Sequence, residues 1–84
     1  MAEVETRIAV IAIIVEDSNS AVEINSLLHE YSSYIIGRMG IPYPAKSVSL
    51  ISVAIDAPAD TISALTGKLG RVKSVTVKTA YSKI

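Results

Sequence analysis

Five polar or aromatic residues could form a small-molecule site, and they lie in two short segments of the chain. Asp17, Ser18 and Asn19 follow an apolar run, whereas Arg38 and Tyr43 lie in a segment rich in glycine and proline. Backbone N–H groups at the start of a helix bind carboxylates and phosphates, and a guanidinium pairs with the same groups. The acidic side chains of the first segment oppose an anion, so helix capping is its competing interpretation.

The residue types needed for catalysis or for a closed metal site are scarce in this sequence. The chain has one histidine, His29, and no cysteine, whereas a transition-metal site takes three or four ligands. Two copies of His29 could share a metal across a symmetric interface, although a histidine on the surface of a helix is the simpler interpretation. The segment from Thr66 to Gly70 does not follow a strand, so it is no phosphate-binding loop. We therefore expect no enzyme activity, no cofactor and no metal, with His29 as the remaining metal candidate.

The charge balance argues against binding to nucleic acid or to a membrane. The 84 residues include eight acidic and eight basic ones, so the formal net charge is zero. Nucleic-acid binders carry a basic surplus, and anionic membranes attract basic segments. Residues 1–6 form a polar lead that is acidic, unlike the basic start of a signal peptide, so we expect a cytoplasmic protein. The length corresponds to a single domain, residues 1–84.

A continuous apolar run dominates the first part of the chain. Residues 7–15 read RIAVIAIIV, in which eight apolar residues follow an arginine and most are branched at Cβ. The run is too short to span a membrane and is typical of a buried strand. Its side chains are apolar on both faces, so each face of this strand needs a cover.

The next segment predicts a helix, a short strand and an arm. A helix capped by Asp17 or Ser20 runs to about Ser32, with apolar side chains at the spacing i, i+3, i+4, i+7. Residues 34–37 then read as a short edge strand. Glycines and prolines punctuate residues 38–44, which indicates a turn or a protruding arm.

The remaining residues predict two strands around a second helix. Residues 48–56 are largely apolar on both faces, which is typical of a central strand. Pro58 suits the first position of a helix that ends at Gly70. Gly67 inside this helix is unfavourable, which indicates close packing or a ligand approach. Residues 75–81 alternate as an edge strand does.

This order of elements predicts an α+β, ferredoxin-like β-α-β-β-α-β fold. The four-stranded antiparallel sheet has the spatial order fourth, first, third, second, with both helices on one face. Covering the apolar helix-free face contributes about 2 kcal/mol per large side chain, against a total stability of roughly 4–12 kcal/mol. We therefore predict a homo-oligomer. The expected interface residues are Ile8, Val10, Ile14, Ile41, Tyr43 and Leu50.

Several segments resemble one small bacterial family. They are IAVIAIIVED (8–17), LLHEY (27–31), YIIGRMGIPY (34–43), ISVAIDAP (51–58), ISALTGKLG (62–70) and VKTAYSK (77–83). The family is that of the iron-only hydrogenase system regulators, small ACT-like proteins similar to the C-terminal domain of the nickel-responsive repressor. The resemblance covers nearly the whole chain and implies an ACT-like, ferredoxin-like fold and assembly as a tetramer.

Two features of the nickel-responsive repressor do not carry over. Its metal site uses several histidines and one cysteine, whereas this chain has His29 alone. Its ACT-like half follows a ribbon-helix-helix DNA-binding segment, whereas residues 1–6 alone precede the first strand here, so we expect no direct contact with nucleic acid. The resemblance implies a transcriptional regulator linked to an iron-only hydrogenase system. We therefore expect a non-enzymatic regulatory domain, a homodimer or dimer of dimers, that senses a small effector or binds a protein partner. The alternative is a structural or assembly factor for metallocluster biogenesis that has no small-molecule ligand.

Overall fold

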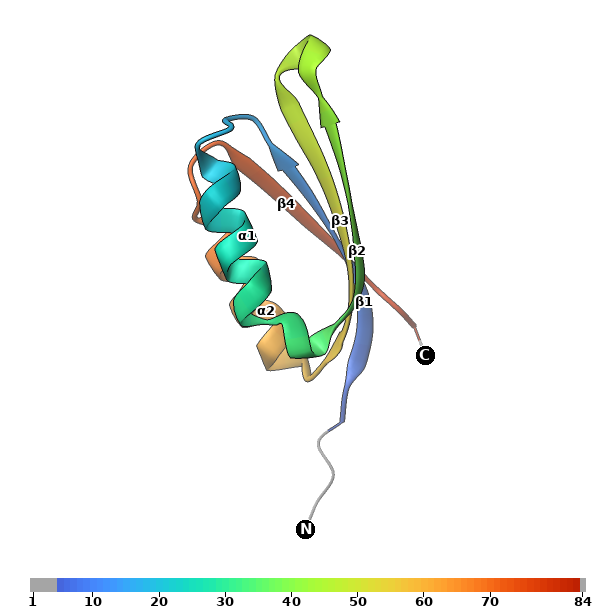
Figure 1. Ribbon diagram of the computed structural model, residues 1–84. Helices are drawn as coiled ribbons and strands as arrows, with labels where there is room; N and C mark the ends of the chain where they lie inside the picture. The colour runs from blue at the N-terminus through green and yellow to red at the C-terminus, as the bar shows by residue number, and fades with distance from the viewer. Residues whose placement is uncertain (1–4, 84) are drawn as a thin grey trace.

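Four strands and two α-helices form the main part of the chain in a computed structural model, which describes residues 5–83 (Figure 1). Residues 1–4 of the predicted polar lead, and residue 84, lie outside the described residues. The β-α-β-β-α-β order confirms the predicted ferredoxin-like α+β fold. In chain order the elements are β1 (Arg7–Val15), α1 (Ser20–Glu30), the short 3-10 helix η1 (Ser32–Tyr34), β2 (Ile35–Tyr43), η2 (Pro44–Lys46), β3 (Val48–Ala57), α2 (Ala59–Gly70) and β4 (Val75–Tyr81).

The four strands form one antiparallel sheet with the predicted order β2-β3-β1-β4. Its central strand β1 alternates strictly, so that Ala9, Ile11, Ile13 and Val15 are buried while the residues between them are exposed. Both helices lie on one side of the sheet (Figure 1). Within the described residues, the second apolar face of β1 therefore has no layer above it.

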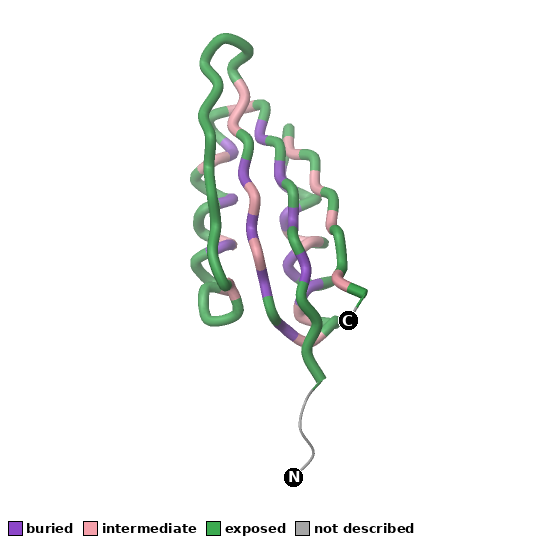
Figure 2. The backbone as a smooth tube through the Cα atoms, turned by 90° about the vertical axis from the view of Figure 1, so that its right-hand side faces the viewer, coloured by how far each residue is buried: buried purple, intermediate pink, exposed green. Residues whose placement is uncertain are grey.

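Side chains from both helices close the core against the buried face of the sheet. Ile24 and Leu28 of α1, and Ile62, Leu65 and Leu69 of α2, are at most 1% exposed. They lie at the i, i+3 and i+4 spacings that the sequence pattern predicts. The buried residues of the two central strands alternate with exposed residues along β1 and mostly with half-buried residues along β3 (Figure 2). The core is thus a single layer between the helices and the sheet.

The start of α1 differs from the predicted cap at Asp17 or Ser20, because no side chain caps the helix. Ser20 is the first residue of the helix, and its Oγ donates a hydrogen bond of 2.6 Å to the backbone carbonyl of Lys73. The Asp17 Oδ1 accepts a hydrogen bond of 3.0 Å from the backbone N–H of Asn19, which fixes the turn before the helix. The helix ends at Glu30, earlier than predicted, because the chain tightens into η1. Ser20 therefore ties the helix to the loop before β4 and does not cap it.

The second strand is longer than the sequence indicates. β2 continues to Tyr43 and pairs with β3 along its length, so the prediction of a strand ending at residue 37 is wrong. Pro42 is tolerated because β2 lies at the edge of the sheet, where a missing N–H breaks no hydrogen bond of the ladder. The turn comes later, at η2 and at Ser47, which has a left-handed φ of 55°. The resulting β2–β3 hairpin projects beyond the rest of the sheet, as a protruding arm would (Figure 1).

Lys68 joins the two helices on their solvent side. Its Nζ lies 3.1 Å from the Glu30 Oε2 and 5.1 Å from the centre of the Tyr31 ring. Hydrogen bonding to the Tyr31 side chain, and then to Glu30, raises the pKa of Lys68 above its usual value. Lys68 therefore keeps its positive charge, and this link between the helices, throughout the neutral pH range.

The α2 helix differs from the prediction at Pro58 and at Gly67. Pro58 is the N-cap residue and lies just before the first residue of the helix. A Cβ atom at Gly67 would meet nothing nearer than the Arg71 Nη2, at 4.0 Å, and this glycine has no positive φ. The close packing predicted at Gly67 is therefore absent.

Gly67→Ala should raise the free energy of unfolding by about 0.5–1 kcal/mol, because alanine loses less backbone entropy in a helix. The measurement is urea unfolding followed by circular dichroism. Ala64→Gly, at an exposed position of the same helix, should shift the stability by a similar amount in the opposite direction. A loss of stability in Gly67→Ala would mean that the position meets a surface outside this copy of the chain.

Candidate functional site

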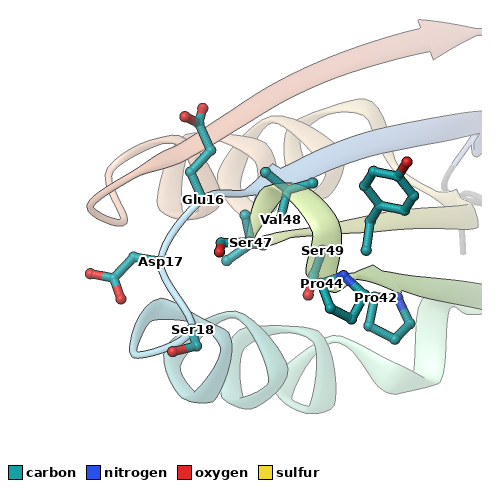
Figure 3. Close-up of a pocket in the computed structure, with 10 residues that line it drawn as sticks. Glu16, Asp17, Ser18, Pro42, Pro44, Ser47, Val48 and Ser49 are labelled. Carbon is teal, nitrogen blue, oxygen red and sulfur yellow. The ribbon is translucent and has the colours of Figure 1, made fainter.

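An open pocket of about 500 Å³ lies between the β1–α1 turn and the β2–β3 hairpin (Figure 3). The strand register creates it, because Ser49 of β3 pairs with Val15 at the end of β1 and with Pro42 near the end of β2. The turn after β1 is thereby held beside the base of the projecting hairpin. The lining residues are Val15, Glu16, Asp17, Ser18, Pro42, Tyr43, Pro44, Ser47, Val48 and Ser49.

The pocket combines apolar rings with acidic and hydroxyl groups. Pro42, Tyr43 and Pro44 form its hairpin side, and the turn contributes the carboxylates of Glu16 and Asp17. Negative charge on one wall disfavours an anionic ligand, since no basic side chain lines the pocket to offset it. This chemistry suits a small molecule with a neutral or positively charged polar group and an apolar body.

The structure brings three of the five predicted effector residues together. Asp17, Ser18 and Tyr43 all line the pocket, whereas Asn19 and Arg38 do not. Arg38 lies on the helix side of β2, where its Nη2 donates a hydrogen bond of 2.7 Å to the Asn25 Oδ1. The two arm residues thus belong to opposite faces of one strand.

Sequence reasoning missed the second half of the pocket. Ser47, Val48 and Ser49 contribute to it because the hairpin turns at η2 and returns as β3. The two prolines beside Tyr43 were the available signal, since they mark a rigid segment. Prolines also favour turns, and this signal is correct for Pro44 in η2 but wrong for Pro42, which lies on β2.

The helix-free face of the sheet exposes a continuous set of apolar side chains. All six predicted interface residues are 39–52% exposed in this single copy of the chain. Met39, which pairs with Ser52 in the register, adds a side chain that is 62% exposed and was not predicted. A patch of this kind on a small domain is typical of a contact surface. Its predicted members are Ile8, Val10, Ile14, Ile41, Tyr43 and Leu50.

His29 lies on the exposed surface of α1. Within residues 5–83, no group of three or more histidine, cysteine or carboxylate side chains is arranged to hold a metal ion. In the same residues, no helix is both long enough and apolar enough to cross a membrane.

The family follows from comparison with known proteins. A sequence model of the TM1266-like family, described as "Iron-only hydrogenase system regulator, putative", matches residues 7–79. The chain belongs to this family. The resemblance inferred from the sequence motifs is therefore confirmed. The solved structure of the uncharacterized protein TM1266 from Thermotoga maritima is 38% identical and aligns with a TM-score of 0.91, covering 94% of this chain and 100% of that one.

Two more distant solved structures share the fold. The C-terminal domain of the MgtC protein from Mycobacterium tuberculosis aligns with a TM-score of 0.74 at 9% identity, covering 99% of this chain and 95% of that domain. A formyltetrahydrofolate deformylase from Pseudomonas putida KT2440 aligns with a TM-score of 0.63 at 11% identity, covering 87% of this chain and 28% of the deformylase. At such identities the likeness concerns the fold alone. No curated protein matches the chain.

The TM1266-like match contains both surfaces described above. Residues 7–79 include every lining residue of the pocket and all six predicted interface residues. The description of the family names a regulator of a hydrogenase system. Both surfaces are therefore candidates for the function of a TM1266-like protein.

Proposed function

We propose that this TM1266-like chain is a non-enzymatic regulatory domain that acts in the cytoplasm as a homo-oligomer, either a dimer or a dimer of dimers. The helix-free face of its sheet joins the copies. The pocket between the β1–α1 turn and the hairpin binds a small effector, and the bound state is read by the hydrogenase system to which the family is assigned.

The observation that carries the proposal is that Tyr43 belongs both to the pocket and to the helix-free face. This residue lines the pocket, and it also lies on the helix-free face together with Met39 and Ile41, because alternate residues of a strand share a face. An effector that contacts Tyr43 therefore contacts a residue of the oligomer interface. Binding and assembly are then coupled, and each changes the other by the same factor.

The apolar face supports the assembly. The two helices form one layer that covers one side of the sheet (Figure 1). The described residues provide no layer for the other side. The net charge of zero adds little repulsion between copies. A second copy offers the same apolar surface in a self-complementary arrangement.

A thermal-shift screen with amino acids, nucleotides and metal ions tests effector binding. A ligand at one hundred times its dissociation constant should stabilise the fold by about 2.7 kcal/mol, which is several degrees in Tm for a chain of this size. The acidic turn leads us to expect neutral or cationic compounds among the ligands found. Asp17→Asn keeps the oxygen that bonds Asn19 but removes the charge, so it should abolish most of the shift.

Glu23→Gln, an exposed change on α1, is the matched control and should leave the ligand shift intact. A screen in which no compound stabilises the protein would remove the effector from the proposal. The alternative role in assembling a metallocluster enzyme, without a small ligand, would then be favoured.

A further inference from the structure

We propose that two copies pack with their helix-free faces together and their hairpins at opposite ends, around a two-fold axis that crosses β1 and β3 level with Ile13 and Ile51. This arrangement deepens the proposed function, because it rests on the homo-oligomer and specifies how the copies meet. The occupant of the face is therefore a second copy of this chain in one defined orientation.

The first observation is a hollow in the middle of the apolar face. It measures about 310 Å³, and the small side chains Ala12 and Ser52, which are cross-strand partners, form its floor. Ile14 and Leu50, the next pair on the same face, stand beside it as a ridge. The face thus carries an elevation at Ile14 and Leu50 and a depression two residues away along the strands, and a second hollow follows beside Gly37 and Ala54.

A two-fold axis between the ridge and the hollow makes the face complementary to itself. Rotation about an axis level with residue 51 places Leu50 of each copy opposite Ser52 of the other, and Ile14 opposite Ala12. Farther along, the register places Tyr43 opposite Gly37. Large side chains meet small ones at each of these places, which is how two layers interdigitate at native packing density. On β2 the same axis places Ile41 opposite Met39, so two large apolar side chains meet there, and the unbranched methionine adapts its shape to the contact.

The opposite orientation lacks this complementarity. With the hairpins at the same end, β3 of one copy lies over β1 of the other at the same level, so Leu50 meets Ile14 and Ser52 meets Ala12. Ridge then meets ridge while the hollow faces a hollow, which leaves a cavity between the layers. The head-to-tail arrangement is therefore favoured.

The area of the face agrees with the head-to-tail arrangement. Four strands spaced about 4.8 Å apart and about 30 Å long present roughly 600 Å² in flat projection, and more when side chains are counted. A standard interface buries about 600–1,000 Å² on each partner, so the face reaches the lower end of this range.

Chemical cross-linking reads the orientation directly, because the natural chain has no cysteine. Val48→Cys and Ala54→Cys place single thiols three residues on either side of the axis. A bismaleimide with a spacer of about 10 Å, the separation of stacked sheets, should join a Val48→Cys chain to an Ala54→Cys chain. Neither variant should cross-link with itself, because identical positions are then about 20 Å apart along the strands.

The controls distinguish an error in the proposed orientation of the two copies from an error in the proposed oligomer itself. Glu23→Cys on α1 should give no cross-link. Self-cross-linking of Ala54→Cys would establish the same-end orientation and overturn the proposal. A dimer that gives no cross-link in the mixture would mean that another surface joins the copies, which overturns the orientation but not the oligomer. A monomeric mass would overturn the orientation and the proposed oligomer together.

Filling the hollow gives a second, independent readout. Ser52→Trp should raise the dissociation constant of the dimer at least tenfold, because the indole occupies the space that Leu50 of the other copy needs. Ser63→Trp, on the exposed side of α2, should leave the dissociation constant unchanged. Unaltered association in Ser52→Trp would contradict the proposal, provided that circular dichroism shows the fold intact.

Discussion

Leu50→Lys should convert the protein into single, folded subunits. Leu50 lies on the helix-free face and is 41% exposed in one copy, so the longer lysine fits the isolated subunit without strain. Between two sheets the ammonium would be buried without a partner, which costs several kcal/mol for each copy. The two-fold symmetry introduces the change twice, so we expect the dissociation constant to rise by about three orders of magnitude or more.

Sedimentation velocity at micromolar concentration measures this effect, and circular dichroism verifies that the subunit stays folded. Val22→Lys is the matched control, because Val22 is 76% exposed on α1 and lies on the opposite side of the molecule from the helix-free face. The control should keep the mass of the natural protein. Equal masses for Leu50→Lys and Val22→Lys would show that this face does not join the copies.

Ile11→Ala should be the most destabilising single truncation in the sheet. Ile11 is fully buried at the centre of β1, where it pairs with Val53 on one side and Thr79 on the other. Removing three buried carbons leaves a cavity and lowers the free energy of unfolding by about 2–5 kcal/mol. A chain of this length has roughly 4–12 kcal/mol in total, so this single truncation removes a large part of the stability of the fold.

Urea unfolding, with both variants at the same protein concentration, tests this expectation. Val22→Ala removes apolar volume from the exposed side of α1 and should change the stability by less than about 0.5 kcal/mol. A loss below about 1 kcal/mol in Ile11→Ala would contradict the single core layer between the helices and the sheet.

The sequence predicts the central elements well because their patterns have one physical interpretation. An apolar run on both faces fits only a central strand, and β1 and β4 begin and end at the predicted residues. The helices follow their apolar stripes, and the crossover rule orders the strands. The central strands and the helices are defined by which side chains are buried, and the spacing of apolar residues in the sequence indicates this burial directly.

The edge strand β2 could not be predicted in the same way. Its residues from 36 to 43 are exposed on both faces, so no burial pattern records its period. Its pairing with β3 is a tertiary property, and Gly37, Gly40 and Pro42 suggest a turn when this partner is unknown. The hydrogen-bonded pairing of β2 with β3 therefore outweighs the preference of these glycines and this proline for a turn.

The same error explains which candidate site residues were misplaced. On a turn or a protruding arm, as predicted, Arg38 and Tyr43 could converge on one ligand. On a strand they are five positions apart and therefore lie on opposite faces, with Arg38 toward Asn25 and Tyr43 toward the pocket and the open face. The β1–α1 turn was located correctly because a strand end and a helix start fix it locally.

The mass of the natural chain in solution tests the central claim most directly. Sedimentation velocity across a range of concentrations from about 1 to 100 µM should give a dimer or tetramer that dissociates only at the lowest values, as expected for an apolar interface of standard size. A mass of about 8.9 kDa at every concentration would contradict the account, because the helix-free face would then be stable in contact with water alone.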